Sequence, residues 1–269
     1  MVWKVSGSMP IPSGYGETLR PARESPAAEA AWQFFADHRF EHRVLPDGRC
    51  DIMLRFPSDG EEVLGPVAAL VSGPATRFHA VSIEAGTCFV GIRLRPGTAK
   101  PVLGISPGLI TNEVLKGEVA LMLVPALGAL VQKLTRGSWT VGGVMQQLSS
   151  FVDDRCADGG VNSTTPLIDA LHVSGGRLPI RDIAALHTMS VRTVHRRITE
   201  ATGLTPKELA MVIQFHRALR LRLRDGLGVA ATALEAGYSD QAHMTRVFRR
   251  LGGVSPARLP ELALAGLPI

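Results

Sequence analysis

The sequence predicts an α+β protein, in which a β-rich amino-terminal half with flanking helices precedes an all-α carboxyl-terminal part. Three observations predict this fold class. Short runs alternate between apolar and polar residues from about 44 to 95, apolar residues recur at helical spacing from about 127 onward, and one helical unit occurs twice after residue 180. A chain of 269 residues is long enough to form two domains, and each could bury a hydrophobic core.

The β-rich part carries its strand signals next to turn signals. "RVLPDGRCDIMLRF" places a Pro-Asp-Gly turn before an alternating run, and "CFVGIRLRPG" alternates again and ends in a Pro-Gly turn. Turn residues in "PSDGEE" and "GPVAALVSGP" separate the runs. Several short strands with frequent turns predict a small barrel or sandwich, extending to about residue 100.

Helical periodicity follows over residues 110–155. Apolar residues recur at i, i+3, i+4 and i+7 in Leu127–Leu134 and again in Val141–Phe151, after a possible cap at Ser138. The sequence predicts two amphipathic helices joined by "TRGSW". Their apolar stripes either cover the barrel or also form the seam of a homodimer, and the pattern leaves both open.

A linker is expected next, because "CADGGVNSTTP" consists of small, polar and turn-forming residues. We therefore predict an amino-terminal domain over residues 1–155, a linker over 156–165 and a carboxyl-terminal domain over 166–269. Everything after the linker has helical patterning.

Charge is spread unevenly over these parts. The formal net charge is +5, but residues 172–258 hold 14 Arg and Lys against 6 Asp and Glu, and 13 of the 14 cations are arginine. The rest of the chain is mildly acidic. A basic surplus confined to one third of the chain points to nucleic acid or an anionic surface as partner of that third. Arginine suits bidentate recognition of phosphate and guanine.

Cysteine use and hydropathy favour a soluble cytoplasmic protein. The three cysteines are widely spaced and contain no C-x-x-C pair, which is typical of reduced thiols. The first residues lack the apolar run of a signal peptide, and the most hydrophobic segment, Val119–Val131, is too short to span a bilayer.

The most informative feature is an internal duplication. "IAALHTMSVRTVHRRITEATGLTP" begins at Ile183, and "TALEAGYSDQAHMTRVFRRLGGVSP" begins at Thr232. A shift of about 50 residues superposes them. Each copy is a short apolar helix, a turn, a Ser or Asp cap and a basic helix closed by glycine. A short helix, a tight turn and an exposed polar helix form the helix-turn-helix of DNA binding, whose second helix enters the major groove.

The two copies are joined by "PKELAMVIQFHRALRLRLRD", which predicts a linking helix over Pro206–Asp225. A helix of that length can hold two reading heads in a fixed relation. If both enter the groove on one side of the duplex, they sit about one turn, roughly 34 Å, apart.

From about Pro166 to Leu259 the chain resembles the DNA-binding domain of AraC/XylS-type transcription regulators, with "AGYSDQAHMTRVFRRLGGVSPARL" close to the family signature. "LPDGRCDIMLRF" and "GIRLRPG" resemble, more loosely, the amino-terminal sensory domain of a subset of these proteins. The resemblance implies a cupin-like β domain that is regulatory rather than catalytic, a small-molecule effector, double-stranded promoter DNA and RNA polymerase as partners, and no cofactor.

Two other functions stay open beside an effector-controlled regulator. One is a regulator without a small-molecule effector, controlled by a protein partner. The other is a metal-dependent cupin enzyme whose basic half only localises it on DNA. The sequence leaves open the effector, the operator and whether transcription rises or falls.

In the first reading helix the outward residues match positions that contact bases in the family. They are Arg192, Thr193, His195, Arg196 and Arg197. Arginine can donate two parallel hydrogen bonds to guanine O6 and N7, and histidine can donate one. We expect base contacts from Arg192, His195 and Arg196.

In the second reading helix Gln241 could pair with adenine, whereas Ala242 offers only a methyl group. Arg246 could instead brace the fold through Glu235. The expected DNA contacts in this helix are Gln241, Ala242, His243, Thr245, Arg246, Arg249 and Arg250. The threonine and the last two arginines are expected to hold phosphates, which position the helix without reading sequence.

The amino-terminal half offers candidate effector contacts at the mouth of the predicted barrel. They are Asp47, Arg49, Asp51, Arg93 and Arg95. Buried arginines would bind an anionic ligand, but charges that protect an exposed strand edge would produce the same pattern.

The same half contains four side chains that could ligate a metal ion. His38 and His42 lie at i, i+4, and Cys50 and His79 could join them as ligands, but no compact signature supports this and we expect no metal.

Overall fold

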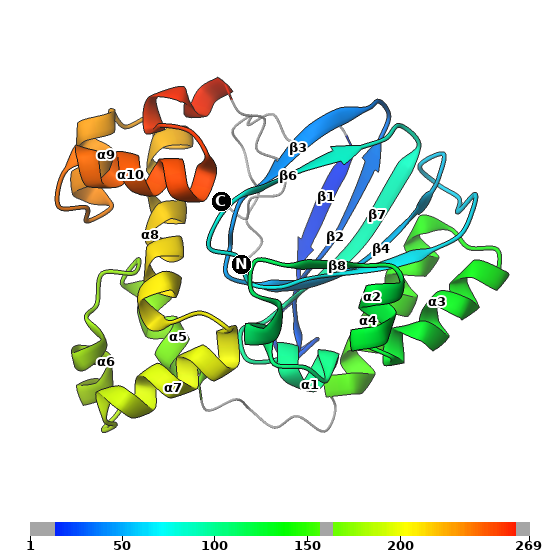
Figure 1. The fold of residues 1–269 in the computed structure, drawn as a ribbon, viewed down its shortest axis with the longest axis horizontal. Coiled ribbons are helices and arrows are strands. Elements are labelled where there is room, and N and C mark those ends of the chain that lie inside the picture. The colour runs from blue at the N-terminus through cyan, green and yellow to red at the C-terminus, as the bar shows by residue number, and fades with distance from the viewer. Residues whose placement is uncertain (1–13, 157–163, 262–269) are drawn as a thin grey trace.

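The computed structural model describes residues 14–156 and 164–261, and it shows a sheet-rich half beside a helical half (Figure 1). The predicted linker falls mostly on residues outside the described ranges. The observed architecture confirms the predicted α+β class.

A six-stranded antiparallel sheet forms the body of the amino-terminal half. Its strand order is β1-β2-β7-β4-β5-β8, and β3 pairs with β6 in a separate two-stranded sheet, so the half is a sandwich of two unequal layers. The strands are β1 Tyr15–Leu19, β2 Ala28–Ala36, β3 Phe40–Val44, β4 Cys50–Pro57, β5 Ala68–Ser72, β6 His79–Ile83, β7 Thr87–Leu94 and β8 Val114–Lys116.

The large sheet has two chemically different faces, because side chains alternate along a strand. Ile52 and Leu54 of β4 and Ile92 of β7 are fully buried on one face. On the opposite face the register places Asp51 beside Arg93. One face therefore belongs to an apolar core, and the other carries charge.

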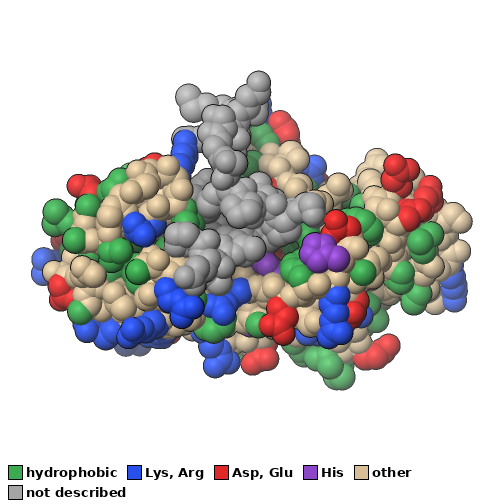
Figure 2. All heavy atoms as spheres, turned by 90° about the horizontal axis from the view of Figure 1, so that it is seen from above, with side chains coloured by type: hydrophobic (Ala, Val, Ile, Leu, Met, Phe, Trp, Pro, Cys, Tyr) green, Lys and Arg blue, Asp and Glu red, His purple; other side chains and the backbone are tan. Residues whose placement is uncertain are grey.

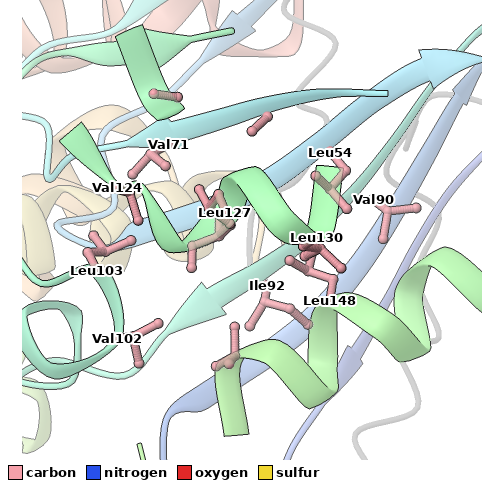
Figure 3. Close-up of a cluster of buried hydrophobic side chains, with 14 of the residues drawn as sticks. Leu54, Val71, Val90, Ile92, Val102, Leu103, Val124, Leu127, Leu130 and Leu148 are labelled. Atoms are coloured by element: carbon pink, nitrogen blue, oxygen red, sulfur yellow. The ribbon is translucent and has the colours of Figure 1, made fainter. Parts of the chain in front are cut away.

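Helices cover the apolar face. Leu127, Leu130 and Leu148 pack with strand residues such as Val90 and Ile92 in one core (Figure 3). The helices are α1 Ala99–Leu103, the 3-10 helix η1 Pro107–Ile110, α2 Glu118–Leu123, α3 Ala126–Arg136 and α4 Val141–Cys156. The predicted apolar stripes are thus used inside the chain.

Two details of the predicted helical region were wrong. Residues 110–155 are not all helical, since β8 adds a strand to the sheet edge by pairing with β5. The cap of α4 is Thr140 rather than Ser138, because the Thr140 hydroxyl accepts a hydrogen bond from the Gly143 amide at 3.1 Å.

The carboxyl-terminal half is entirely helical and has two small cores. One contains Ile183, Val194 and Ile198, and the other contains Met244 and Phe248. The elements are α5 Thr165–Val173, α6 Ile180–Leu186, α7 Val191–Thr202, α8 Pro206–Leu223, α9 Val229–Glu235, α10 Gln241–Gly252 and the 3-10 helix η2 Pro256–Glu261. The linking helix α8 contributes to both cores and joins them.

The ends of the helices follow the sequence signals. Ser190 accepts from the Thr193 amide at the start of α7, and Asp240 accepts from the His243 amide at the start of α10. Thr205 and Glu208 form a capping box at the start of α8.

Cys50, Cys88 and Cys156 are all free and buried. Among the described residues, no helix is long and apolar enough to cross a membrane.

Candidate nucleic-acid interface and ligand cavity

The two reading helices α7 and α10 lie at opposite ends of α8 (Figure 1). α8 has 18 residues. At 1.5 Å per residue it spans about 27 Å. This separation is of the order of one turn of DNA, roughly 34 Å, which two successive major-groove contacts require.

The first reading helix exposes its predicted contact residues. Arg192, His195 and Arg196 are exposed, whereas Val194 and Ile198 on the opposite side are buried. Thr193 is half-buried and its hydroxyl lies 2.8 Å from that of Ser190, so it serves the cap. Arg197 is half-buried as well.

The second reading helix exposes a similar set around one shallow depression, which is lined by Gln241, Ala242, Thr245, Arg246 and Arg249. Thr245 donates its hydroxyl to the Gln241 carbonyl oxygen at 2.8 Å.

Two further residues of α10 complete the predicted set. His243 is held by Ser239 at 3.2 Å and by an edge contact with the Tyr238 ring. Arg250 is exposed. The bracing pair between Arg246 and Glu235 does not form in the structure.

The exposed arginines have no protein partner that would hold them. In the described part of the chain, the guanidinium groups of Arg192, Arg196, Arg246, Arg249 and Arg250 make no hydrogen bond or ion pair. Figure 2 shows Lys and Arg side chains gathered along one edge on the side of the helical half. Free guanidinium groups on an exposed helix are available to phosphates and base edges.

A second candidate site lies between the large sheet and the β3–β6 layer. It is a cavity of about 230 Å³. Aromatic side chains form much of its wall, namely those of Tyr15, Trp32, Phe34, Phe40 and Phe89.

One end of the cavity is rich in charge. Arg93 Nη1 lies 2.7 Å from Glu17 Oε1, and Arg93 Nε lies 3.1 Å from Asp47 Oδ2 and 3.9 Å from Asp51 Oδ1. The neighbouring Arg49 is bound to Glu29 at 2.5 Å. Three carboxylates therefore share one guanidinium group.

Burial shifts the ionisation of these groups. It raises the pKa of Asp51 to about 7, and Asp47 adds to the rise while Arg93 opposes it. Burial and the neighbouring His79 lower the pKa of His42 to about 4. Both pKa shifts have the same cause: a charged side chain is disfavoured in a cavity wall that water solvates poorly.

The structure brings together four of the five predicted effector contacts. Asp47, Arg49, Asp51 and Arg93 line the cavity. Arg95 does not line it, since it lies beyond the end of β7 and donates to the Arg20 carbonyl oxygen.

Sequence reasoning missed the partners of these charges and the aromatic wall. Glu17 and Glu29 neutralise the two arginines, and Tyr15 and Trp32 come from strands that carried no recognised signal. Only the alternation in "YGETL" and "AEAAWQFFA" could have indicated which side chains share the inner face. Among the described residues, no group of three or more His, Cys, Asp or Glu side chains could hold a metal ion.

The segment from residue 43 to 49 lies in the amino-terminal half and also contacts the helical half. Leu45 lines the cavity and also packs in the core of the second helix-turn-helix unit. The Pro46 carbonyl oxygen accepts a hydrogen bond from His216 Nε2 of α8 at 2.7 Å. Arg49 Nη2 lies 3.4 Å from His172 Nε2 of α5.

The ends of both reading helices rest on the amino-terminal half. Thr111 Oγ1 donates to the Gly203 carbonyl oxygen at 3.2 Å, just after α7. Arg43 Nη1 donates to the Gly252 carbonyl oxygen at 3.0 Å, at the last residue of α10, and its guanidinium group lies 4.7 Å from the Phe78 ring centre.

Two capped helix-turn-helix units on one linking helix, each with exposed arginines, define a DNA-binding protein of the double helix-turn-helix class. A family model described as "Helix-turn-helix domain" matches residues 183–261, and one described as "Domain of unknown function (DUF6597)" matches residues 25–116.

Curated relatives match the helical part. The chain is 32% identical over 75 residues to "HTH-type transcriptional activator RhaS" of Klebsiella pneumoniae (strain 342), covering 28% of this chain and 27% of that protein. It is 32% identical over 74 residues to the protein of the same name from Escherichia coli (strain K12 / DH10B), with the same coverage. The match thus spans about a quarter of these relatives.

Solved structures are similar at lower identity. ToxT from Vibrio cholerae has a TM-score of 0.46 at 10% identity, over 94% of this chain and 100% of that one. The DNA-binding domain of AdpA, solved with a target DNA, has a TM-score of 0.35 at 25% identity, over 38% of this chain and 92% of that one.

The carboxyl-terminal double helix-turn-helix domain is thus similar to that of AraC-type transcriptional regulators.

Proposed function

We propose that this protein is a sequence-specific transcription regulator that reads two successive major grooves of DNA with α7 and α10 and is controlled by a small molecule in the cavity. The observation that carries the proposal is the pair of capped reading helices, whose outward arginines have no partner in the described residues. Such arginines supply both phosphate neutralisation and bidentate base contacts.

The two reading helices have different roles in DNA recognition. Arg192 and Arg196 lie one helical turn apart on the exposed side of α7, where they can reach base edges together. On α10 we assign base contacts to the exposed Gln241 and Arg246, to which Ala242 adds a methyl contact, and phosphate contacts to Arg249 and Arg250. We therefore assign most sequence discrimination to the first helix.

The cavity is placed so that its occupancy can reach the DNA-binding half. Segment 43–49 forms part of the cavity wall and contacts α5, α8 and the core around α10. A ligand that moves this wall changes the surface on which the helical half rests. Ligand control then requires only that the ligand binds one arrangement of the wall better than another.

Other aspects follow from the same assignment. The matched relatives are described as activators, which favours activation through RNA polymerase. We propose residues 1–155 as the sensory and dimerisation domain and 166–269 as the DNA-binding domain, acting in the cytoplasm without enzymatic activity. The leucines of α3 and α4 that were candidates for a dimer seam are buried in the chain's own core, so a seam would use the half-buried Val131, Met145 and Phe151.

The test is to map the genomic DNA bound by the full chain and to titrate the protein on that DNA and on a scrambled duplex. We expect the mapped site to bind at least about 1,000-fold more tightly than the scrambled duplex. Replacing both Arg192 and Arg196 by alanine should remove most of this preference, whereas the control Arg23→Ala, in the connection between β1 and β2, should not. Equal affinity of the wild-type protein for both duplexes would contradict the proposal.

A further inference from the structure

We propose that the cavity binds an amphiphilic organic anion, whose carboxylate lies at Arg55 and Lys116 and whose apolar body lies between the two sheet layers. This inference rests on the proposed function, because it names the chemical class of the effector. It differs from the sequence-based expectation in the residues that meet the anion. Two of the arginines expected there, Arg49 and Arg93, are held by carboxylates of the chain itself.

The first argument is a pair of unmatched cations. Arg55 of β4 and Lys116 of β8 both line the cavity and are exposed, which places them where the cavity opens to solvent. Neither side chain makes a hydrogen bond or an ion pair with any described residue. A guanidinium or ammonium group without a protein partner is available to a ligand carboxylate.

The acidic groups of the cavity wall lie too far away to pair with these cations. The lining carboxylates are those of Asp47 and Asp51, and both belong to the cluster around Arg93. Arg55 follows Asp51 by four residues on β4, which is about 13 Å along a strand. Lys116 is on β8, two strands from β4 in the sheet order, which is about 10 Å across the sheet. Positive charge is therefore unopposed at the opening.

The second argument is that the histidines near the opening can donate to an anion. Burial and the nearby Lys116 lower the pKa of His79, which lines the cavity from β6. His42 of β3 lines it as well, and its pKa is about 4. Both imidazoles are thus neutral near pH 7, and a neutral imidazole keeps one N–H group that can donate a hydrogen bond.

The third argument is that the end around Arg93 does not favour a cation. The polar atoms buried there without a hydrogen-bond partner in the described part of the chain are donors, Arg93 Nε and Arg49 Nη1. Burial raises the pKa of Asp51 to about 7, so about half of these carboxyl groups are protonated at pH 7. A ligand cation would therefore meet unsatisfied donors at one end of the cavity and free cations at the other.

The fourth argument is the apolar wall next to the free cations. The register of the large sheet sets Arg55 beside Phe89, and Phe89 beside Phe34, on the face that lines the cavity. Phe34 meets Phe40 of the β3–β6 layer edge to face, with ring centroids 5.6 Å apart. Aromatic side chains from both layers thus enclose this part of the cavity. An aryl or alkyl group attached to a carboxylate at Arg55 would lie against these rings.

The experiment is calorimetric titration of the full chain with three probes of one size. They are 4-phenylbutanoate, 4-phenylbutanol and 4-phenylbutylammonium. We expect the carboxylate to bind at least about fivefold more tightly than the alcohol, because two exposed cations each add a modest attraction. The ammonium ion should bind most weakly, because the same cations repel it. Raising the salt from about 0.05 M to about 0.5 M should remove most of the advantage of the carboxylate, since salt screens exposed charges.

Variants assign the effect to the two cations. The double variant Arg55→Gln with Lys116→Gln should lower the affinity for the carboxylate at least about fivefold and leave that for the alcohol within about twofold. Lys116→Gln alone should give a smaller loss and serves if the double variant does not fold. The matched control is Arg77→Gln with Lys100→Gln, which removes the same two charges from exposed positions that do not line the cavity. It should leave all three affinities unchanged.

The inference is overturned if the alcohol or the ammonium ion binds as tightly as the carboxylate, or if no probe binds at millimolar concentration. It is also overturned if the variants at Arg55 and Lys116 keep the wild-type affinity for the carboxylate, or if the control loses it as well. DNA binding by the same preparations separates this inference from the proposed function. Tight promoter binding without carboxylate selectivity contradicts only the ligand class, and carboxylate selectivity without any DNA preference contradicts only the proposed function.

Discussion

The two helix-turn-helix units have the same plan but differ at their turns. In the first, Met189 N donates to the Ala184 carbonyl oxygen at 2.9 Å, and in the second Tyr238 N donates to that of Ala233 at the same distance. The residue that needs a left-handed backbone is Gly237 in the second unit, with φ of 81°. Its counterpart is Thr188, with φ of 53°. The first turn therefore has a left-handed backbone at Thr188, although threonine disfavours that conformation.

The units also differ in how the amino-terminal half holds them. Main-chain contacts, together with the Thr111 hydroxyl, hold the first: Gly97 N donates to the Ala201 carbonyl oxygen at 3.1 Å, and an added Cβ on Gly203 would lie 2.8 Å from the Gly108 nitrogen. A side chain holds the second, because Arg43 reaches Gly252 and lies over Phe78.

This difference suggests which helix-turn-helix unit responds to ligand binding in the cavity. Backbone contacts at α7 leave little room for adjustment. The arginine contact at α10 continues directly into the cavity-lining segment 43–49, so movement of that segment shifts the support of the second unit first. We infer that the first unit provides fixed sequence reading and that the second provides adjustable affinity.

The largest expected effect tests whether the two units have separate cores. Phe248→Ala removes a fully buried ring and should cost about 3–5 kcal/mol of stability. Because Phe248 packs only in the second core, hydrogen exchange should show loss of protection in α9 and α10 while α6 and α7 stay protected. The matched variant Ile198→Ala should give the reverse pattern. Equal loss in both units would show that they unfold together.

The next effect tests the division between base reading and phosphate holding. Arg196→Ala should relax sequence preference, since one bidentate base contact is worth about 1–3 kcal/mol of discrimination. Titration on the operator and on scrambled DNA measures it. If both DNAs lose affinity equally, Arg196 is a phosphate contact.

Arg249→Ala is the counterpart on the second helix. It should weaken binding to both DNAs nearly alike and lower the slope of log affinity against log salt by about one. Arg249 lies near the end of α10 and has no protein partner in the described residues, which suits a contact with the DNA backbone. A selective loss on the operator alone would assign it to base reading instead.

Much of this comparison was available from the sequence. Caps at Ser190 and Asp240 and closing glycines are local signals, because a helix end needs a particular side chain or backbone conformation at one residue. The alternation along β4 and β7 likewise placed Asp51 and Arg93 on a common face.

What the sequence could not provide depends on residues far apart in the chain. Glu17 reaches Arg93 across 76 positions, and Arg43 reaches Gly252 across 209. Such pairs leave no spacing pattern, so the arginines of the cavity looked free and suggested an anion. Thr188 was missed for another reason: nothing in its type indicates a left-handed turn, which the surrounding hydrogen bonds impose.

A smaller effect tests the strained turn. Thr188→Gly should stabilise the first unit by about 1 kcal/mol, because glycine adopts the left-handed region without the clash of a β-branched side chain. Thr188 is exposed, so its removal loses little packing. Thermal unfolding measures the gain. The reciprocal change, Gly237→Ala, should destabilise the second unit, and a gain there would contradict the equivalence of the two turns.

The smallest effect comes from the caps, which differ in whether they titrate. Asp240 caps α10 as a carboxylate, and its hydrogen bond from the His243 amide lowers the pKa of Asp240 below its usual value. A carboxyl group whose pKa is lowered on folding stabilises the folded state above its unfolded pKa, near 4, and this contribution is lost as the pH falls through the folded pKa. Ser190 caps α7 with a hydroxyl group and does not titrate in this range.

Acidification should therefore loosen the start of α10 before that of α7. Amide hydrogen exchange of His243 and Thr193, followed from pH 6 to about pH 3 and corrected for intrinsic rates, measures this difference between the two caps. Asp240→Ser, which gives the second unit the cap of the first, should make the two amides respond alike. Other carboxyl groups titrate in the same range, but they affect the wild-type protein and the variant alike. Only the cap should therefore change the exchange protection of the His243 amide relative to that of Thr193. If His243 keeps its protection relative to Thr193 throughout, the carboxylate cap does not hold α10.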